Sequence, residues 1–542
     1  MLSLRSRNLA LQLMVLVAVC AFLFFFGLGA FGLTGADEPR YAQIAREMLN
    51  RHDWIKPTLN GAPWLEKPVL VYWQAMISYK IFGVHDWAAR VPSAVFASGL
   101  VLAIFFFMRR FRPGSQLDAA LIAASSAAVV GFARGASTDM QMTAPFCVAM
   151  LAWWTWHEGG NKIWLAAFYA LLGIGMLAKG PIAPAFAVLI VAAYASMRRD
   201  KAIFLRSLWW PGFLLFFAVA LPWYIAVEIK VPEFFRVFFL QHNLERFATD
   251  RYRHAQPFWY YIPVFLLSIL PWIVFSAPAL AGAFRSVARV LSSGEIRRDG
   301  HANQGQDPEW LTPFLLLWIV IPVFFFSFSR SKLPGYILPA IPPAAILTAS
   351  YLHRSEQALS RLKLILHAAI CGALVAGALI APWKMQKLSL PPTVRLQVAV
   401  AATLLGVSVI LIVRRGGLKM LHFATLLPVI VAIGFLLRPA ANVVDQIYSA
   451  RAVDLELRNL GAEHQPIALF NVKREVEYGL NFYRNEPISR YDREGVPSTA
   501  HVAVAAEGSE NGIRVQAAGR KVFFLGNFRL QHLEFFLVSS AR

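Results

Sequence analysis

The sequence predicts a polytopic α-helical membrane protein with a small α/β domain at its C-terminus. Of its 542 residues, 57% are hydrophobic and only 15% are charged, and the mean hydropathy is +0.52. Such a composition is unlike that of a soluble domain. Apolar stretches long enough to cross a bilayer recur along residues 1–440, whereas apolar and polar positions alternate in residues 441–542. We therefore expect a transmembrane domain over the first range and an α/β domain over the second.

The transmembrane part is predicted to contain about thirteen spans. A helix needs about 20 apolar residues to cross a hydrocarbon core of roughly 30 Å, and several stretches are shorter or carry a proline. The first stretch is too long for the apolar region of a secretory signal, so we expect an uncleaved helix. The spans lie near residues 9–31, 88–108, 117–133, 140–156, 163–178, 182–196, 209–228, 258–279, 311–328, 336–351, 364–382, 394–413 and 418–437.

Lysine and arginine predict the orientation of these helices. With the N-terminus inside, basic clusters collect in alternate loops, as the positive-inside rule describes. An odd number of spans then places the C-terminal domain outside, which in a Gram-negative bacterium is the periplasm. The net charge of +21 is explained by this topology, and we expect no nucleic-acid partner because the clusters are scattered over short loops. The clusters lie at residues 5–7, 109–112, 198–201, 285–298, 354–363 and 414–419.

The first outward loop, residues 32–87, begins with charged residues close to the bilayer. Asp37, which is followed by Glu-Pro, is placed where a helix N-cap is expected. Residues 41–49 then carry an apolar stripe at helical spacing, and residues 72–79 hold a tryptophan and two tyrosines. We therefore expect two interfacial helices, the first lying flat with its apolar stripe toward the lipid.

Helix capping does not explain a second acidic site in the same loop. Glu66 and Lys67 lie between Trp64 and Pro68, and a further proline precedes the tryptophan. Prolines on both sides favour an extended segment of low entropy. A solvated Glu–Lys pair in a rigid turn is the simpler interpretation. A cation fixed here would nevertheless meet a lipid phosphate as it leaves the bilayer, and the acid beside it could act on a sugar.

The next long outward loop, residues 229–257, is rich in aromatic residues and contains two histidines. His242 and His254 flank a charged stretch and are, with Glu66, candidate ligands for a divalent cation. Their spacing matches no recognised metal motif, so we expect no required cofactor. The sequence has no nucleotide-binding or HExxH motif, which argues against nucleotide-driven chemistry.

Other polar residues lie at the outer edges of later spans. Lys332 and Tyr336 belong to a segment whose cations run against the topology rule, although an ordinary juxtamembrane loop explains it equally well. Arg134, Asp139 and Lys179 lie at the ends of other spans. For each of these three alone, we expect a role at a helix end or in an ion pair.

The final segment changes from long apolar runs to short ones. Residues 466–472, 502–505 and 522–525 read as buried strands, with helical pieces between them. This pattern predicts a small α/β domain. The sequence leaves open whether that domain binds a substrate or only supports the loops.

Taken together, the outward motifs resemble those of the GT-C glycosyltransferases. The resemblance rests on the acidic pair after the first span, on residues 64–68, on residues 177–181 and on residues 331–336. More narrowly, the motifs are similar to those of the lipid A 4-amino-4-deoxy-L-arabinose transferases, which are relatives of the protein O-mannosyltransferases. The likeness covers about residues 1–440 and extends to the outer domain.

The resemblance implies a reaction and a location. The donor would be undecaprenyl phosphate-linked 4-amino-4-deoxy-L-arabinose, the acceptor a phosphate of lipid A or its precursor, and the outcome inversion at the anomeric carbon. The enzyme would lie in a bacterial inner membrane with its site facing the periplasm. Its product would weaken the binding of polymyxin and other cationic peptides.

The resemblance also implies roles for individual residues. Because the leaving group is a phosphate, the reaction needs charge stabilisation more than protonation. Asp37 and Glu66 would orient the acceptor or bind the amino group of the sugar, with Arg40 holding Asp37. If the acceptor were a hydroxyl, Asp37 would be the base. The residues expected to bind the lipid phosphate and sugar are Lys67, Arg251, Arg253, Lys332, Tyr336, Tyr41, Trp64 and Asp139.

Two other functions stay open. One is sugar transfer from another polyprenyl phosphate, as in a protein O-mannosyltransferase. The other is a transporter or flippase, which is disfavoured because transporters place ionisable groups near the midplane and often consist of related halves. In this sequence the charges gather at one face, and an outer domain is appended.

Overall fold

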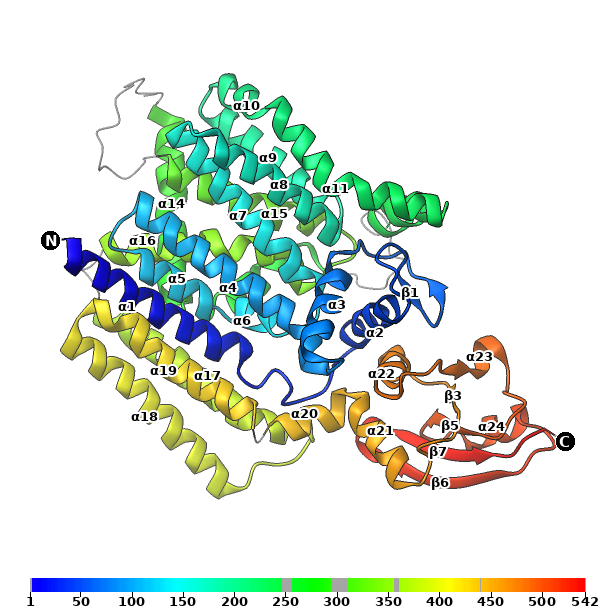
Figure 1. Ribbon diagram of the computed structural model, residues 1–542. Coiled ribbons are helices and arrows are strands. Elements are labelled where there is room, and N and C mark those ends of the chain that lie inside the picture. The colour runs from blue at the N-terminus through cyan, green and yellow to red at the C-terminus, as the bar shows by residue number, and fades with distance from the viewer. Residues whose placement is uncertain (1, 246–255, 294–309, 355–359, 439, 542) are drawn as a thin grey trace.

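The computed structural model has a helical body and a smaller domain built around a five-stranded sheet (Figure 1). The sheet domain lies at one end of the helical body, beside the first polar loop (Figure 1). The structure describes residues 2–245, 256–293, 310–354, 360–438 and 440–541, and of residues 2–7, 241–245, 290 and 293 only the backbone.

Helices occur in all thirteen stretches that were predicted to span the membrane, although the helix in the first, residues 9–31, ends at Phe25. They are α1 (Leu2–Cys20) with η1 (Ala21–Phe25), α4 (Asp86–Phe111), α5 (Gln116–Ser125), α6 (Ala127–Ala133), α7 (Thr138–Gly159), α8 (Lys162–Lys179), α9 (Ile182–Met197), α11 (Trp210–Lys230), α13 (Tyr261–Ser268), α14 (Ile273–Ser293), α15 (Leu311–Phe328), η4 (Pro334–Ala340) with α16 (Ile341–Arg354), α17 (Arg361–Met385), α18 (Pro392–Gly416) and α19 (Leu421–Leu436). A short helix, α10 (Lys201–Ser207), precedes α11.

A strict count of spans is lower than thirteen. Within the described part of the chain, nine helices are long and apolar enough to cross a membrane, or ten if α5 and α6, bent by 64°, form one span. The other predicted spans fall on α7, on the 16-residue α9 and on the pair α13 and α14, which is interrupted before Ile273. Helices interrupted in this way occur where protein, not lipid, surrounds the break.

Aromatic rings and small residues pack the helical body. Trp153, Trp272 and Trp318 are fully buried, and rings of this size dominate the packing energy of a core. Small residues let helices approach, since a Cβ atom on Gly173 of α8 would lie 2.9 Å from Val219 of α11. Close approach through glycine is a common way for helices to associate in lipid.

Arg134 closes the end of the first span. Its guanidinium donates hydrogen bonds to the carbonyl oxygens of Leu23, Phe26 and Gly27, at 3.0, 2.9 and 3.1 Å. Carbonyls at the end of a helix lack partners within the helix and need donors of this kind. The expected helix-end role of Arg134 is therefore confirmed.

The first polar loop folds into two helices joined through a short hairpin. Asn60 and Gly61 form the turn with φ of 53° and 76°, the positive values that a tight two-residue hairpin requires. The hairpin delivers the chain to the segment that carries Glu66. The elements of the loop are α2 (Asp37–Asn50), β1 (Thr58–Leu59), β2 (Ala62–Pro63) and α3 (Leu70–Phe82).

The apolar stripe of α2 packs against protein, which corrects the prediction that it faces lipid. Ile44 and Met48 are fully buried and Tyr41 nearly so, beneath α3 and helix α22 (Arg474–Arg484) of the C-terminal domain. Tyr72 of α3, which was expected in the headgroup layer, is buried in the same cluster. An amphipathic stripe specifies a buried face but not what covers it.

The C-terminal domain is a mixed sheet with helices on both faces, so the predicted small α/β domain is confirmed. Its order is β4-β3-β5-β7-β6, in which β3 (Ile467–Phe470) is parallel to β4 (Ser489–Arg490) and β5 (His501–Ala506). β7 (Leu533–Val538) is antiparallel to β5 and to β6 (Val522–Phe528).

The helices of this domain explain the apolar run in its central strand. Side chains of β5 alternate between two buried clusters, one with α21 and α22 and the other with α23 and α24. A strand covered on both faces is apolar throughout. The helices other than α22 are α20 (Ala441–Tyr448), α21 (Ala450–Asn459), α23 (Tyr491–Glu494) and α24 (Glu510–Gln516).

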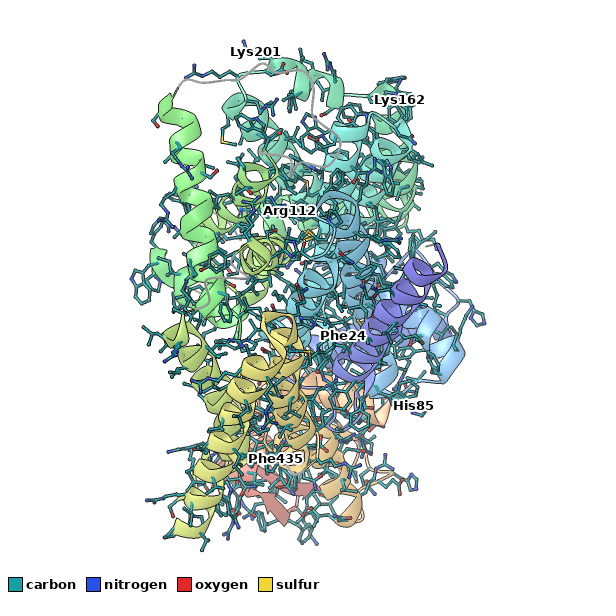
Figure 2. All side chains as sticks on the ribbon, turned by 90° about the vertical axis from the view of Figure 1, so that its left-hand side faces the viewer. Phe24, His85, Arg112, Lys162, Lys201 and Phe435 are labelled. Atoms are coloured by element: carbon teal, nitrogen blue, oxygen red, sulfur yellow. The ribbon has the colours of Figure 1, made fainter. Side chains whose placement is uncertain are left out.

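Charged ends distinguish the two sides of the helical body. Figure 2 shows Lys162 and Lys201 at one end of the body and His85 toward the other. The two lysines begin α8 and α10, whereas His85 immediately precedes α4. In Figure 1, α2 and the C-terminal domain lie on the side of the helical body away from α10.

Candidate active site

Arg40 joins two carboxylates that come from separate segments of the first loop. Its Nη2 donates to Asp37 Oδ1 at 2.6 Å, and its Nη1 lies 3.7 Å from Glu66 Oε2. The first pair follows from the i, i+3 spacing at the start of α2, whereas Glu66 arrives on the segment after the hairpin. Asp37 is the first residue of the helix and Ala36 its N-cap, so the alternative interpretation of Asp37 as the N-cap is wrong.

Three aromatic rings surround the Arg40 guanidinium. Its Cζ lies 5.2 Å from the ring centroid of Tyr41, 5.0 Å from that of Trp64 and 5.6 Å from that of Tyr478. Tyr478 belongs to α22 of the C-terminal domain and meets Trp64 edge to face at 6.3 Å. Aromatic faces attract cations and displace water from them. The cluster is thus assembled from both parts of the protein.

Burial and charge act in opposite directions on Arg40. Its side chain is only 7% exposed. Burial lowers its pKa, whereas Tyr41, Asp37 and Glu66 raise it, and the net pKa lies above the ordinary value. Arg40 therefore remains a cation. Its acidic partners are more accessible, with side-chain exposures of 60% for Asp37 and 25% for Glu66.

Three hydrogen-bond donors beside this ion cluster lack an acceptor among the described residues. They are Arg40 Nε, Trp64 Nε1 and the hydroxyl of Tyr72, whose ring centroid is 6.1 Å from that of Tyr41. A buried donor without a partner costs about 1–3 kcal/mol. Three such donors together suit a group from outside the chain that offers several acceptors. A phosphate is such a group.

Glu47 of α2 fixes the hairpin that leads to Glu66. Its carboxylate accepts hydrogen bonds from Thr58 Oγ1 at 2.6 Å and from the backbone N–H groups of Asn60 and Gly61 at 2.8 and 3.2 Å. One helix therefore supplies two members of the ion cluster and also holds the segment that supplies the third.

Glu38, next to Asp37, belongs to a different network. Arg90 of α4 donates to it from Nε and Nη2, at 2.9 and 2.7 Å. Glu38 also accepts from the backbone N–H groups of Thr34 and Ala136, at 2.9 and 2.8 Å. Burial by itself raises the pKa of Glu38, but the Arg90 charge and these hydrogen bonds outweigh it, and the net pKa is lowered. This network joins the first loop to α4 and to the turn before α7.

A second polar cluster brings together three of the predicted motifs. Lys179 at the end of α8 donates to Asp139 of α7 and lies 4.8 Å from the ring centroid of Tyr336. A Cβ atom on Gly335 would lie 2.7 Å from Asp139 Oδ1, so a glycine is required for this approach. The expected ion-pair role of Asp139 and Lys179 is therefore confirmed.

Lys332 points into the protein. It is 6% exposed, and its Nζ donates to the carbonyl oxygen of Gln256 at 3.0 Å and to that of Ser329. Burial lowers its pKa. Lys332 thus orders its own loop and carries its charge close to the start of η4.

The other predicted residues are placed only in part. Lys67 is half-buried directly after Glu66. Arg251, Arg253 and His254 lie outside the described residues, as does the side chain of His242. Where the structure describes side chains, no three His, Cys, Asp or Glu residues are placed to hold a metal ion.

Sequence reasoning missed Tyr72 and Tyr478 as neighbours of the ion cluster. The sequence placed Tyr72 in a predicted helix with aromatic residues, which could have indicated a site, but we assigned those residues to the headgroup layer. Tyr478 gave none, because its contacts with Arg40 and Trp64 join parts of the chain that are remote in sequence.

The fold and this site define a polytopic helical protein with apolar helices of membrane-spanning length, a polar site at one face and an appended sheet domain. A known structure has the same fold. The crystal structure of ArnT from Cupriavidus metallidurans bound to undecaprenyl phosphate superposes with a TM-score of 0.74, over 97% of this chain and 97% of that one, at 22% sequence identity.

Sequence comparison finds similarity to known glycosyltransferases over part of the chain. Residues 9–238, which include the whole first loop, match the dolichyl-phosphate-mannose-protein mannosyltransferase family. The undecaprenyl phosphate-alpha-4-amino-4-deoxy-L-arabinose arabinosyl transferase of Edwardsiella ictaluri is 35% identical over 326 residues, which are 59% of this chain and 55% of the relative. The undecaprenyl phosphate-alpha-4-amino-4-deoxy-L-arabinose arabinosyl transferase 1 of Pseudomonas fluorescens is 34% identical over 357 residues. These residues are 64% of this chain and 60% of the relative.

The chain thus matches between half and two thirds of the length of these curated relatives. The resemblance to the aminoarabinose transferases that the motifs indicated is confirmed as sequence similarity and as a shared fold.

Proposed function

We propose that this protein is a glycosyltransferase that moves 4-amino-4-deoxy-L-arabinose from undecaprenyl phosphate to a phosphate of lipid A, with inversion. The observation that carries the proposal is the Arg40 cluster, in which one buried cation holds two accessible carboxylates beside three unpaired donors. The names of the relatives supply the donor.

The donors and cations at this face suit a phosphate leaving group. In the reaction, the bond from the anomeric carbon to the carrier phosphate breaks, and a bond from that carbon to an acceptor phosphate oxygen forms. Both phosphates are ionised at neutral pH, so no proton has to move. The donors on Arg40, Trp64 and Tyr72, with the cation of Lys67, would stabilise the charge that develops on the departing phosphate.

The two carboxylates would act on the sugar and the acceptor. Asp37, the more exposed, and Glu66 are oriented by the same guanidinium, so both can face one bound molecule. An acidic pair attracts the ammonium of an aminosugar and the oxocarbenium character of a glycosyl transition state. Arg40 acts through these acids and is a positioning residue. No cofactor is needed for this chemistry.

The remaining predicted residues complete the proposed binding site. Arg251 and Arg253 would add cations for the lipid phosphate. Lys332, Tyr336 and Asp139 would line the path of the donor from the bilayer, the last two held together through Lys179.

The proposed location is the inner membrane of a Gram-negative bacterium, with the site and the C-terminal domain in the periplasm. The basic residues at the opposite end of the helical body support this orientation. The modification would reduce the negative charge of lipid A and so confer resistance to polymyxin.

A second candidate is transfer to a protein hydroxyl, which the match of residues 9–238 to a protein mannosyltransferase family favours. Purified full-length protein in liposomes, given undecaprenyl phosphate-aminoarabinose with lipid A or with a serine-rich peptide, separates the two. We expect mass to be added to lipid A alone, with Glu66→Gln inactive and the surface variant Glu510→Gln active. Addition to the peptide alone would favour the second candidate.

A further inference from the structure

We propose that the C-terminal domain completes this active site through Tyr478 and Asn481 of α22, which act as positioning residues. The proposal rests on the proposed function, because it assigns both residues to the same site. It also gives the domain a direct part in holding Arg40 and the Glu66 segment in place. Three sets of contacts lead to it.

The first set anchors the domain at points away from the ion cluster. Arg451 of α21 pairs with Asp86 of α4 at 3.0 Å and with Asp445 of α20 at 2.8 Å. The backbone N–H of Leu33 donates to the Tyr483 hydroxyl at 2.7 Å. These contacts fasten the domain to the helical body without help from Tyr478 or Asn481.

The second set brings Tyr478 onto the Arg40 guanidinium. Its ring, on a residue that is 5% exposed, covers the guanidinium at 5.6 Å and Trp64 at 6.3 Å. The next residue, Gly479, lies against Ala450 of α21 so closely that a side chain would clash. The position of α22 is therefore fixed from behind. A ring held in this way keeps Arg40 from turning away from its two carboxylates.

The third set reaches the other end of the same segment. Asn481 is fully buried, and its Nδ2 donates to Asn60 Oδ1 and to the carbonyl oxygen of Glu486, both at 2.9 Å. Asn60 forms the hairpin turn that precedes Glu66. Tyr478 and Asn481 are three residues apart and so share one face of α22. Through Asn481, that face of α22 holds the hairpin turn at Asn60. Through Tyr478, it contacts Trp64, two residues before Glu66.

This geometry predicts a loss of turnover and not of binding when the ring is removed. We expect Tyr478→Ala to lower kcat by at least about tenfold, with the donor KM changed by less than about threefold. Tyr478→Phe should keep most of the rate, because the ring and not the hydroxyl makes the contacts. Tyr448→Ala, on the exposed side of α20, is the matched control. Wild-type kcat in Tyr478→Ala, or an effect on KM alone, would overturn the proposal.

A measurement that needs no reaction separates this proposal from the proposed function. In hydrogen–deuterium exchange on the full-length protein, Asn481→Ala should accelerate exchange in residues 58–66 and leave the Leu33 amide unchanged. Unchanged exchange in residues 58–66 would overturn the proposal whatever the reaction is. Accelerated exchange in a protein that transfers no aminoarabinose would uphold the positioning role and refute the function.

Discussion

Two arginine networks begin at adjacent acids of α2, and they differ in how completely the arginine is used. Arg90 donates from Nε, Nη1 and Nη2 to Glu38 and to three backbone carbonyl oxygens, all at 2.7 to 2.9 Å. Arg40 makes one short bond, to Asp37, a long one of 3.5 Å to the Tyr41 hydroxyl and a 3.7 Å contact with Glu66, and its Nε has no acceptor among the described residues.

The difference separates a structural ion pair from a site that is prepared for a ligand. A guanidinium has five N–H donors, and when all of them are bonded inside the protein nothing remains for a substrate. The Arg90 network therefore holds the first loop to α4. The Arg40 network combines a buried cation with buried donors that have no partner among the described residues and with two accessible acids. These unpaired donors are the feature that indicates a function.

The largest expected effect is on the Arg90 side of the comparison. Arg90→Met would leave Glu38 buried without its partner, which costs about 3–5 kcal/mol. We expect a marked fall in the melting temperature in detergent and in the yield of folded protein. Arg514→Met, which breaks an exposed pair with Glu510, should cost less than about 1 kcal/mol. An Arg90→Met protein that melts at the wild-type temperature would show that the Arg90 network is not a structural ion pair that stabilises the fold.

Neutralising the acids of the Arg40 network should lower the transfer rate and leave the stability nearly unchanged. We expect Asp37→Asn and Glu66→Gln to lower the transfer rate by about 10²–10³-fold with nearly unchanged melting temperature, because both side chains are accessible to water. Steady-state transfer and thermal unfolding measured on the same preparations test this. Full activity in both variants would exclude the proposed roles.

Lysine substitutions sharpen the comparison, because lysine keeps the charge but lacks the fork of donors. Arg40→Lys should lower turnover by about tenfold or more and stability by only about 1 kcal/mol, since one ammonium cannot hold both carboxylates in place. Arg90→Lys should mainly lower stability. For each variant, the fold-loss in turnover is compared with the loss in unfolding free energy. The same ratio in both variants would contradict the assignment of Arg40 to the active site and Arg90 to the fold.

The smallest effect is on the pH dependence of stability. The pKa of Glu38 is lowered from its ordinary value of 4.5, so its ionised form stabilises the fold above that pH. The stabilisation is lost as the pH falls below 4.5 toward the folded-state pKa. Melting temperatures measured from pH 7 to well below pH 4.5 should therefore fall less steeply in Glu38→Gln than in the wild type, with the difference appearing below pH 4.5. Equal slopes would show that this carboxylate does not carry the effect.

Local patterns predicted much of the fold and the ion-cluster residues of the first loop. Each of the thirteen apolar runs contains helix, and the composition after residue 440 predicted the sheet. The charges near the first span predicted that Asp37 and Arg40 meet. These features depend on residues close together in the chain or on periods of 3.6 and 2 residues.

What the sequence could not predict depends on contacts between remote segments. The stripe of α2 was expected to face lipid, yet α3 and α22 cover it. Glu38 and Asp37 look alike in the sequence, and only the position of Arg90 on α4 separates their roles. Tyr478 reaches the site because the C-terminal domain docks on α2.

The most direct test is mass spectrometry of lipid A from a Gram-negative strain that lacks its own aminoarabinose transferase and expresses this protein. The account predicts a mass gain that matches aminoarabinose, together with polymyxin resistance, in cells with the wild type and with Glu510→Gln. Both should be absent with Glu66→Gln at equal membrane expression. Unmodified lipid A with well-expressed wild type, or modified lipid A with Glu66→Gln, would contradict it.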